Sequence, residues 1–307
     1  MRRAGIDVGG TKFLGVIVDE SGSVISEVRR PTPNGAPALI DALVAVAGDL
    51  GPWDSLGIGM PGLITRDGIV RSSPHLTGVH DLDVRRELAG ALGREVSVDN
   101  DATCAALAEW QVGAGRGVED LVVVTLGTGI GGGIVAGGRL WRGTNGFAGE
   151  FGHMVIDPEG LECPCGRRGC WERYAAGSGL AQLGRDLVAE GRGARILGLA
   201  GGSAAAIRGE HVQQATREGD SDALEAVDRF GRWVALGLVN LANSLDPAMF
   251  VLGGGIAATP ELYVGSITRW FSALLYAPNR RPPPTLTFAR LGEYAGAIGA
   301  ALLPAHT

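Results

Sequence analysis

The segment AGIDVGGTKFLGVIV, residues Ala4 to Val18, consists of an apolar run, a glycine-rich turn and a second apolar run. Two short runs rich in β-branched residues and separated by glycine predict a β-hairpin. The segment VVVTLGTGIGGGIVA, from Val122 to Ala136, has the same pattern. This weak internal repeat suggests two domains built on one plan, each presenting a glycine-rich tip.

Strands and helices alternate outside these hairpins. SLGIGMPGLI (Ser55 to Ile64) and EVSVDND (Glu95 to Asp101) have strand character, whereas DATCAALAEWQVG (Asp101 to Gly113) has helix character. A long apolar helix is predicted at Gly231 to Pro247, a strand at Ala248 to Ala257, and a last helix in YAGAIGAALLPA. This alternation predicts an α/β architecture. The length of 307 residues suggests about two domains.

The composition excludes several classes of protein. A hydrophobic content of 45% with 20% charged residues is typical of a globular chain. The net charge of −6 argues against a nucleic-acid partner. No apolar run approaches the roughly 20 residues that span a bilayer. The opening MRRAGIDVGG has no hydrophobic leader segment, so we expect a cytoplasmic protein without a membrane partner.

Three glycine-rich turns follow predicted strands: DVGGTK at 7–12, LGTGIGGG at 126–133 and GGG at 253–255. Glycines leave backbone N–H groups free to approach an anion, and a lysine adds a compact charge for phosphate. Lys12 is the only lysine among 27 basic residues, either by chance or because an ammonium is needed there. One such turn is usually only a hairpin, and the spacings are not those of the Walker or dinucleotide motifs. Three turns together with Lys12 favour nucleotide binding.

The sequence VDND at 98–101 places Asn100 and Asp101 where a strand becomes a helix. Asp101 is either the N-cap of that helix or a general base at the carboxyl end of a strand, where α/β sheets bind ligands. The local sequence alone favours the cap.

GHMVIDPEGLECPCGRRGCWE, residues 152–172, contains three of the four cysteines. Cys163, Cys165 and Cys170 with His153 form a donor set that suits tetrahedral zinc. A disulfide framework is the rival interpretation, but nothing in the sequence suggests export. Inert core cysteines are the other, although CPCGRRGC is too polar for a core. Cys104, in the alanine-rich helix, is expected to be a small core residue.

Together these motifs resemble the ROK family (repressor, open reading frame, kinase), and within it the bacterial glucokinases, over nearly the whole chain. DVGGTK resembles the first phosphate motif of the family. LGTGIGGGIVAGGRLWRGTNGFAGEFGHM resembles its signature and second phosphate motif. CPCGRRGCWE resembles its zinc motif and VLGGGI its adenosine motif. The most specific feature is the C-x-C-x4-C element after G-E-x-G-H.

The resemblance implies an actin-like ATPase fold of the ribonuclease-H type, with two domains and a cleft between them. We expect a small α/β domain at residues 1–115, with the last helix, 293–307, packing back on it, and a large α/β domain at 116–292 carrying the zinc loop. The implied activity is transfer of phosphate from ATP, with Mg²⁺, to the 6-hydroxyl of glucose. The implied assembly is a homodimer or homotetramer.

Matching the motifs position by position assigns roles to individual residues. Asp101 becomes the base that takes the hydroxyl proton. The expected sugar ligands are Gly62, Asn100, Asp101, Glu150, His153 and Glu172. The expected ATP-binding residues are Asp7, Gly9, Gly10, Thr11, Lys12, Gly127, Thr128, Gly129, Gly253, Gly254 and Gly255. Zinc is expected on His153, Cys163, Cys165 and Cys170. One ring nitrogen of His153 would bind the zinc while the other faces a sugar hydroxyl, so the metal would fix the aim of a substrate ligand.

Residues 74–79 depart from the family pattern. Where many relatives read close to P-N-L-x-G-W, this chain reads PHLTGV. This puts the identity of the hexose in question, with mannose, fructose and N-acetylmannosamine as alternatives and polyphosphate as an alternative donor. His75 is either a new ligand or a surface residue, and we favour the surface.

A sugar-sensing repressor of the same family would carry a DNA-binding segment of roughly 60–80 residues before the first phosphate motif. Here DVGG begins at residue 7, and the chain is acidic. We therefore expect a kinase.

Overall fold

The structure, a computed structural model, describes residues 1–306 and divides into two compact units. Unit 1 contains Met1–Val123, Gly132–Gly149 and Ala289–Thr307, and unit 2 contains Val124–Gly131 and Glu150–Phe288. The domains expected at residues 1–115 and 116–292 stay a prediction. The compact units differ from them chiefly in assigning Gly132–Gly149 to the N-terminal part.

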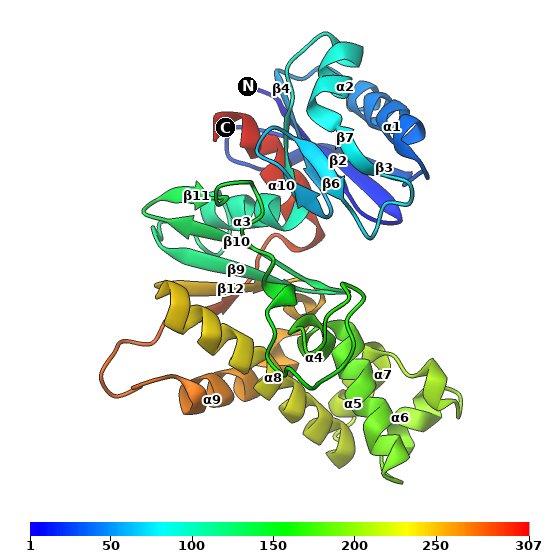
Figure 1. Ribbon diagram of the computed structural model, residues 1–307, viewed down its shortest axis with the longest axis vertical. Helices are drawn as coiled ribbons and strands as arrows, with labels where there is room; N and C mark the ends of the chain where they lie inside the picture. Colours follow the sequence, from blue (N-terminus) through cyan, green and yellow to red (C-terminus); the bar gives the residue numbers. More distant parts are fainter. Residues whose placement is uncertain (307) are drawn as a thin grey trace. The chain divides into compact units, whose positions relative to one another are not determined.

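Unit 1 contains a five-stranded sheet in the order β3-β2-β1-β4-β8 (Figure 1). Its strands are β1 (Arg3–Val8), β2 (Lys12–Val18), β3 (Val24–Pro31), β4 (Ser55–Met60) and β8 (Ser97–Asn100). β1, β2 and β3 are antiparallel neighbours, whereas β4 pairs parallel with both β1 and β8. A smaller sheet contains β5 (Leu63–Ile64), β6 (Ile69–Ser72) and β7 (His80–Asp83). The predicted hairpin at Ala4 to Val18 is therefore present as β1 and β2.

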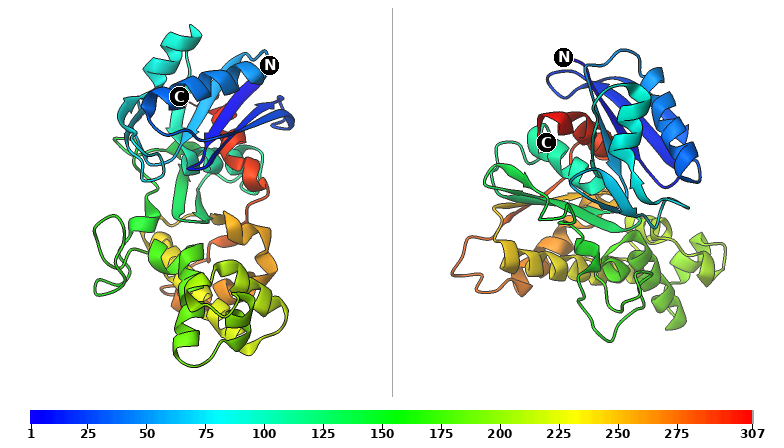
Figure 2. Two further views of the ribbon diagram at one scale, coloured as in Figure 1. Left: turned by 90° about the vertical axis from the view of Figure 1, so that its right-hand side faces the viewer. Right: turned by 45° about the horizontal axis from the view of Figure 1, so that its top comes forward.

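Helices cover both faces of the five-stranded sheet (Figures 1 and 2). Alternate residues of β2 face opposite sides, as the twofold period of a strand requires. Phe13 and Ile17 pack in a core with α1 (Ala36–Asp49) and α2 (Val84–Leu92). Leu14 and Val16 pack in a second core with α3 (Asp101–Gln111) and α10 (Ala295–Leu302).

The last helix, α10, packs closely because glycines face it. A Cβ added at Gly5 of β1 would lie 2.1 Å from the carbonyl oxygen of Ala297. A Cβ at Gly299 of α10 would lie 1.7 Å from the carbonyl oxygen of Cys104, which is fully buried, as expected of a small core residue. Glycine therefore lets α10 approach both the sheet and α3.

The second five-stranded sheet has the order β11-β10-β9-β12-β13. Its strands are β9 (Leu121–Leu126), β10 (Ile130–Ala136), β11 (Arg139–Trp141), β12 (Met249–Gly253) and β13 (Thr285–Phe288). In the first sheet the consecutive strands β1, β2 and β3 lie side by side, and the later strands β4 and β8 are added next to β1. In the second sheet β9, β10 and β11 lie side by side, and β12 and β13 are added next to β9. This shared order confirms that the two glycine-tipped hairpins belong to one repeated plan.

The remaining helices lie in unit 2. They are α4 (Glu172–Ala175), α5 (Gly177–Ala189), α6 (Ala194–Leu199), α7 (Gly209–Arg217), α8 (Ser221–Leu245) and α9 (Val264–Leu274). α8 begins at Ser221 rather than at the predicted Gly231, because Asp220 caps it by accepting a hydrogen bond from the N–H of Ala223 at 2.9 Å. Residues up to 230 have a charged, helical character in the sequence, but the charged residues among the buried Ala226, Val227 and Phe230 interrupt the apolar run from which the start at Gly231 was predicted.

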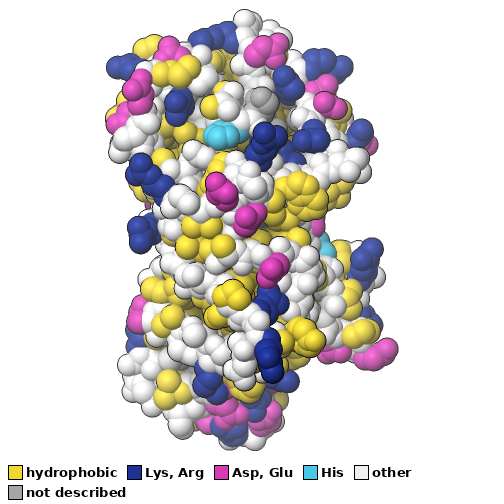
Figure 3. All heavy atoms as spheres, turned by 90° about the vertical axis from the view of Figure 1, so that its left-hand side faces the viewer, with side chains coloured by type: hydrophobic (Ala, Val, Ile, Leu, Met, Phe, Trp, Pro, Cys, Tyr) yellow, Lys and Arg dark blue, Asp and Glu magenta, His cyan; other side chains and the backbone are white. Residues whose placement is uncertain are grey.

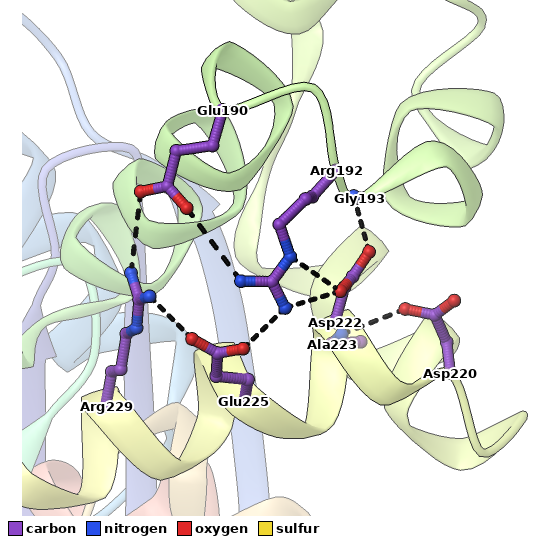
Figure 4. A network of polar contacts seen from close by, with 8 residues as sticks. All are labelled: Glu190, Arg192, Gly193, Asp220, Asp222, Ala223, Glu225 and Arg229. Atoms are coloured by element: carbon purple, nitrogen blue, oxygen red, sulfur yellow. Dashed lines mark hydrogen bonds and ion pairs between the residues drawn. The ribbon is translucent and has the colours of Figure 1, made fainter.

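Ion pairs join the first turns of α8 to the loop after α5 (Figure 4). Arg192 bridges Asp222 at 2.6 Å and Glu225 at 2.5 Å, and Glu225 also pairs with Arg229 at 2.5 Å. The N–H of Gly193 donates to Asp222 at 2.7 Å. The network fixes the loop to the helix rather than forming a separate site.

Charged side chains of both signs are interspersed on the face drawn in Figure 3. Within residues 1–306, no helix combines the length and the apolar character needed to cross a membrane.

Candidate functional site

The junction between β8 and α3 carries the predicted base. Asn100, not Asp101, is the N-cap of α3: its side-chain oxygen accepts from the N–H of Thr103 at 3.0 Å. The Asn100 amide donates to the carbonyl of Gly62 at 3.1 Å. Gly62 has a φ of 105°, and a Cβ there would lie 2.2 Å from the carbonyl oxygen of Ser72. Asp101 is thus free of the capping role that its position suggested, and it opens the helix with a carboxylate that accepts from the N–H of Ala102 at 2.8 Å.

Two carboxyl groups, those of Asp101 at this junction and of Asp7 in β1, have pKa values well above the ordinary range. Burial raises the pKa of Asp101 to about 6, while the N–H of Ala102 and the charge of His75 lower it. Burial raises the pKa of Asp7 to about 7, and repulsion from Asp101 adds to the rise while Lys12 opposes it. A carboxyl whose pKa lies near neutrality can accept a proton in a reaction more readily than one that titrates near 4.

The first glycine turn connects β1 to β2. The N–H of Gly9 donates to the carbonyl of Lys12 at 2.9 Å, and Thr32 donates its hydroxyl to the carbonyl of Gly9 at 2.6 Å. The Lys12 side chain is 59% exposed, and its ammonium lies 3.3 Å from a carboxylate oxygen of Glu293. Arg29 pairs with the same carboxylate at 2.8 Å. Hydrogen bonds therefore hold the backbone of the turn, and an exposed, ion-paired cation lies at its end.

His75 is exposed, as the sequence analysis favoured. A Cβ added at Gly10 would lie 3.3 Å from the His75 Cβ, so the 74–79 loop lies against the first glycine turn. The charge of His75 lowers the pKa of Asp101. An exposed histidine on the altered loop thus acts electrostatically on the predicted base.

The predicted zinc ligands come together in unit 2. The ligand atoms of His153, Cys163, Cys165 and Cys170 all lie within 4.8 Å of one another. The Cys165 and Cys170 sulfurs are 3.5 Å apart, and the Cys163 sulfur is 4.0 Å from His153 Nδ1. Tetrahedral Zn–S bonds of about 2.3 Å separate thiolates by about 3.8 Å. The four cysteines in the described part of the chain are free, which favours the metal over the disulfide interpretation.

The loop also orients groups that face away from the sulfurs. His153 directs Nδ1 toward Cys163, and its Nε2 lies 3.9 Å from a carboxylate oxygen of Glu150. Glu172 follows the predicted ligand Cys170 by two residues and accepts from the N–H of Ile130 at 2.8 Å. The two ring nitrogens of the histidine are therefore divided between the cysteine cluster and a carboxylate.

The second and third glycine turns lie against each other. A Cβ at Gly254, whose φ is 75°, would lie 2.5 Å from the carbonyl oxygen of Leu126. A Cβ at Gly127 would lie 4.0 Å from the backbone nitrogen of Gly255. The N–H of Gly177 donates to the carbonyl of Gly127 at 2.9 Å. Backbone without side chains can closely approach phosphate or a flat ring.

The sequence analysis missed Asp99 and Arg142. Their ion pair measures 2.5 Å, and their side chains are 7% and 12% exposed. The acidic residue directly before Asn100 and Asp101 was a local signal, but nothing in the sequence pointed to its arginine partner 43 positions later.

The comparisons with known proteins agree with this arrangement. The glucokinase of Streptomyces coelicolor is 36% identical over 303 residues, which cover 97% of this chain and 95% of the relative. The N-acetyl-D-glucosamine kinase of Pectobacterium atrosepticum is 34% identical over 314 residues, covering 97% of each chain. The crystal structure of a ROK family glucokinase from Streptomyces griseus, in complex with glucose and AMPPNP, superposes with a TM-score of 0.88 at 36% identity, covering 99% of each chain.

The fold is therefore that of the sugar kinases of the actin-like ATPase class, as predicted. The ROK family model matches residues 3–306, and the chain belongs to the ROK family.

Proposed function

We propose that the protein is an ATP-dependent glucokinase that phosphorylates glucose at its 6-hydroxyl. The observation that carries the proposal is Asp101, held at the carboxyl end of β8 with a pKa raised to about 6. The 36% identity with glucokinases over nearly the whole chain supports glucose as the acceptor.

The proposed role of Asp101 is to accept the proton of the attacking hydroxyl. Phosphoryl transfer depends mainly on positioning and charge stabilisation, and a base placed on the acceptor contributes about 10²–10⁴-fold. Asn100 is fixed by hydrogen bonds to Gly62 and Thr103, so its amide would present a rigid hydrogen-bonding group to a sugar hydroxyl. The turn from Gly9 to Lys12 would hold phosphate, and Asp7 would do so through bound Mg²⁺, which neutralises the negative charge.

In unit 2 the proposed sugar ligands are Glu150, His153 and Glu172. Bound through Nδ1, zinc would leave His153 Nε2 for a hydroxyl, and it would supply fixed orientation rather than reaction chemistry. The adjacent turns at 127–129 and 253–255 would receive the phosphates and adenosine of ATP. Glu172 already accepts one hydrogen bond from Ile130, and its carboxylate has further lone pairs for a sugar hydroxyl.

A second acceptor, N-acetylglucosamine, is supported by a relative of that activity at 34% identity over the same length. The altered 74–79 loop leaves the preference between the sugars to experiment. A homodimer or homotetramer, a cytoplasmic location and the absence of a nucleic-acid partner remain predictions of the sequence.

The test is release of ADP from ATP–Mg²⁺ with glucose, mannose, fructose, N-acetylmannosamine or N-acetylglucosamine, and without sugar. We expect the highest kcat/KM with glucose and almost no release with Asp101→Ala at unchanged fold. A preference for N-acetylglucosamine would show that this sugar, and not glucose, is the acceptor. Absence of sugar-dependent release with every sugar, from folded and metal-replete protein, would refute the assignment.

A further inference from the structure

Arg142 is a cation largely withdrawn from solvent beside the β8–α3 junction of unit 1. It follows β11, and its side chain is 12% exposed. Nε donates to Asp99 at 2.5 Å, and Nη1 donates to the carbonyl of His306 at 3.3 Å. Nη2 is buried and has no hydrogen-bond partner within residues 1–306. A charge-assisted bond of this kind is strong when it is shielded from water.

Asp99 transmits this anchor to the backbone of the junction. One of its carboxylate oxygens meets Arg142, and the other accepts from the N–H of Asn100 at 2.8 Å. Asn100 then caps α3 and holds Gly62, and Asp101 is the next residue in the chain. Hydrogen bonds therefore link Arg142 through Asp99 to Asn100, and the peptide bond of Asn100 leads directly to Asp101, the proposed base.

Arg142 opposes the electrostatic cost of burying the carboxyl groups around it. Asp7, Asp99 and Asp101 all raise the pKa of the buried Cys104 thiol, whereas Arg142 lowers it. These three carboxyl groups therefore share one buried neighbourhood. Burial alone also raises the pKa of Asp99, and the charge and hydrogen bond of Arg142 oppose that rise. Without Arg142, Asp99 would become a buried carboxyl without its partner, and it would take up a proton or move toward water.

We propose that Arg142 is a positioning residue of the phosphoryl-transfer reaction, which through Asp99 holds the backbone of Asn100 and Asp101 in place. The hydrogen bonds of Arg142 described above go to Asp99 and to the carbonyl of His306, so its proposed effect on Asp101 is indirect. The inference rests on the proposed kinase function for its kinetic consequence, but not for its structural one.

The test compares Arg142→Met with Arg142→Lys, Asp99→Asn and the double variant Arg142→Met/Asp99→Asn. Arg281→Met is the matched control, because Arg281 is 20% exposed and likewise joins a carboxylate and a carbonyl, those of Asp246 and Ala242. All kinetics are measured at a temperature where circular dichroism shows each variant folded. Amide hydrogen exchange of the peptide covering residues 97–104 supplies a readout that needs no activity.

We expect Arg142→Met to lower kcat with the preferred sugar by about 10- to 100-fold, since small misplacements of a reacting group have effects of this order. The KM for ATP should change less than threefold, and exchange in residues 97–104 should accelerate. Arg142→Lys should recover part of kcat because an ammonium can still pair with Asp99. The double variant should be no worse than the poorer single variant, whereas Arg281→Met should leave kcat and this peptide unchanged.

Three outcomes would overturn the inference. They are wild-type kcat and exchange in Arg142→Met, additive losses of Arg142→Met and Asp99→Asn, or an equal loss of kcat in folded Arg281→Met. If the wild-type protein phosphorylates no sugar, the proposed function fails, and the exchange measurements alone then decide whether Arg142 holds the junction.

Discussion

Replacing Asp101 by asparagine keeps the shape of the side chain and its acceptor for the Ala102 N–H but removes the ionisable carboxyl. The folded pKa of Asp101 is about 6, against an ordinary value of 3.8. A carboxyl with a raised pKa binds its proton more tightly in the folded state, so its ionisation opposes folding. The wild-type protein therefore loses stability as the pH rises from about 4 to about 6, and the loss is complete above pH 7.

The magnitude follows from the two pKa values. A difference of about two pH units, at 1.36 kcal/mol each, corresponds to about 3 kcal/mol. Because the residue retains some solvent exposure, screening makes this an upper limit, and about 1–3 kcal/mol is expected. For a chain of this size, each kcal/mol corresponds to about 2 °C in Tm. Asp101→Asn should thus raise the Tm at pH 8 by about 2–6 °C, and by much less at pH 4.

The assay is thermal unfolding of both proteins from pH 4 to pH 8, with Asp41→Asn as an exposed control for the exchange of Asp for Asn. Sugar kinase activity should fall by at least 10²-fold in Asp101→Asn, because the amide cannot take up the hydroxyl proton. A gain in Tm that is independent of pH, or a loss of Tm at pH 8, would show that the carboxyl is not destabilised by burial. Retained activity would show that it is not the base.

Three further substitutions test other parts of the structure. Cys165→Ser should lower bound zinc, measured by metal analysis, below one equivalent per chain, and it should raise the KM for sugar. An unchanged KM in folded, metal-depleted protein would refute the orienting role of the loop. Gly129→Ala places a Cβ 2.5 Å from Oε2 of the proposed sugar ligand Glu172, so either the carboxylate or the turn must shift. The KM for sugar or for ATP should rise severalfold in steady-state assays, and two unchanged KM values would contradict both proposed roles. Gly299→Ala places a Cβ 1.7 Å from the carbonyl oxygen of Cys104 and should destabilise unit 1 by about 3 kcal/mol or more in denaturant unfolding, while an unaltered midpoint would contradict the close packing of α10.

Local patterns predicted the elements that depend on local chemistry. Apolar runs around glycine located β1, β2, β9 and β10, and the Asp-to-Gly limits located α3 to within a few residues. The cysteine spacing also identified the four residues that the structure brings together. These features depend on interactions between residues close in sequence, so local sequence patterns suffice to predict them.

Contacts between distant segments leave no such pattern. Glu109 accepts hydrogen bonds from the backbone N–H groups of Arg290 and Leu291, at 2.9 and 2.8 Å and more than 180 positions away. Glutamate is rarely fully buried, yet Glu109 is 1% exposed. Likewise, propensity does not decide which of Asn100 and Asp101 caps α3, because both residues are good N-caps. Asn100 is the cap because its backbone is still extended, with φ −66° and ψ 144°.

Three neighbouring parallel strands bring the acidic groups of the junction together. Asp7 of β1 pairs in register with Gly59 of β4, and Gly59 pairs with Asp99 of β8. A Cβ at Gly59 would lie 3.3 Å from the Cys104 sulfur and 3.5 Å from an Asp7 carboxylate oxygen. Glycine in the central strand therefore weakens the sheet locally but leaves room for carboxyl groups at its carboxyl end. Each buried carboxyl lowers stability at neutral pH, so the arrangement favours chemistry over stability at the carboxyl end of these strands. The close packing of α10 stabilises the same sheet from one face.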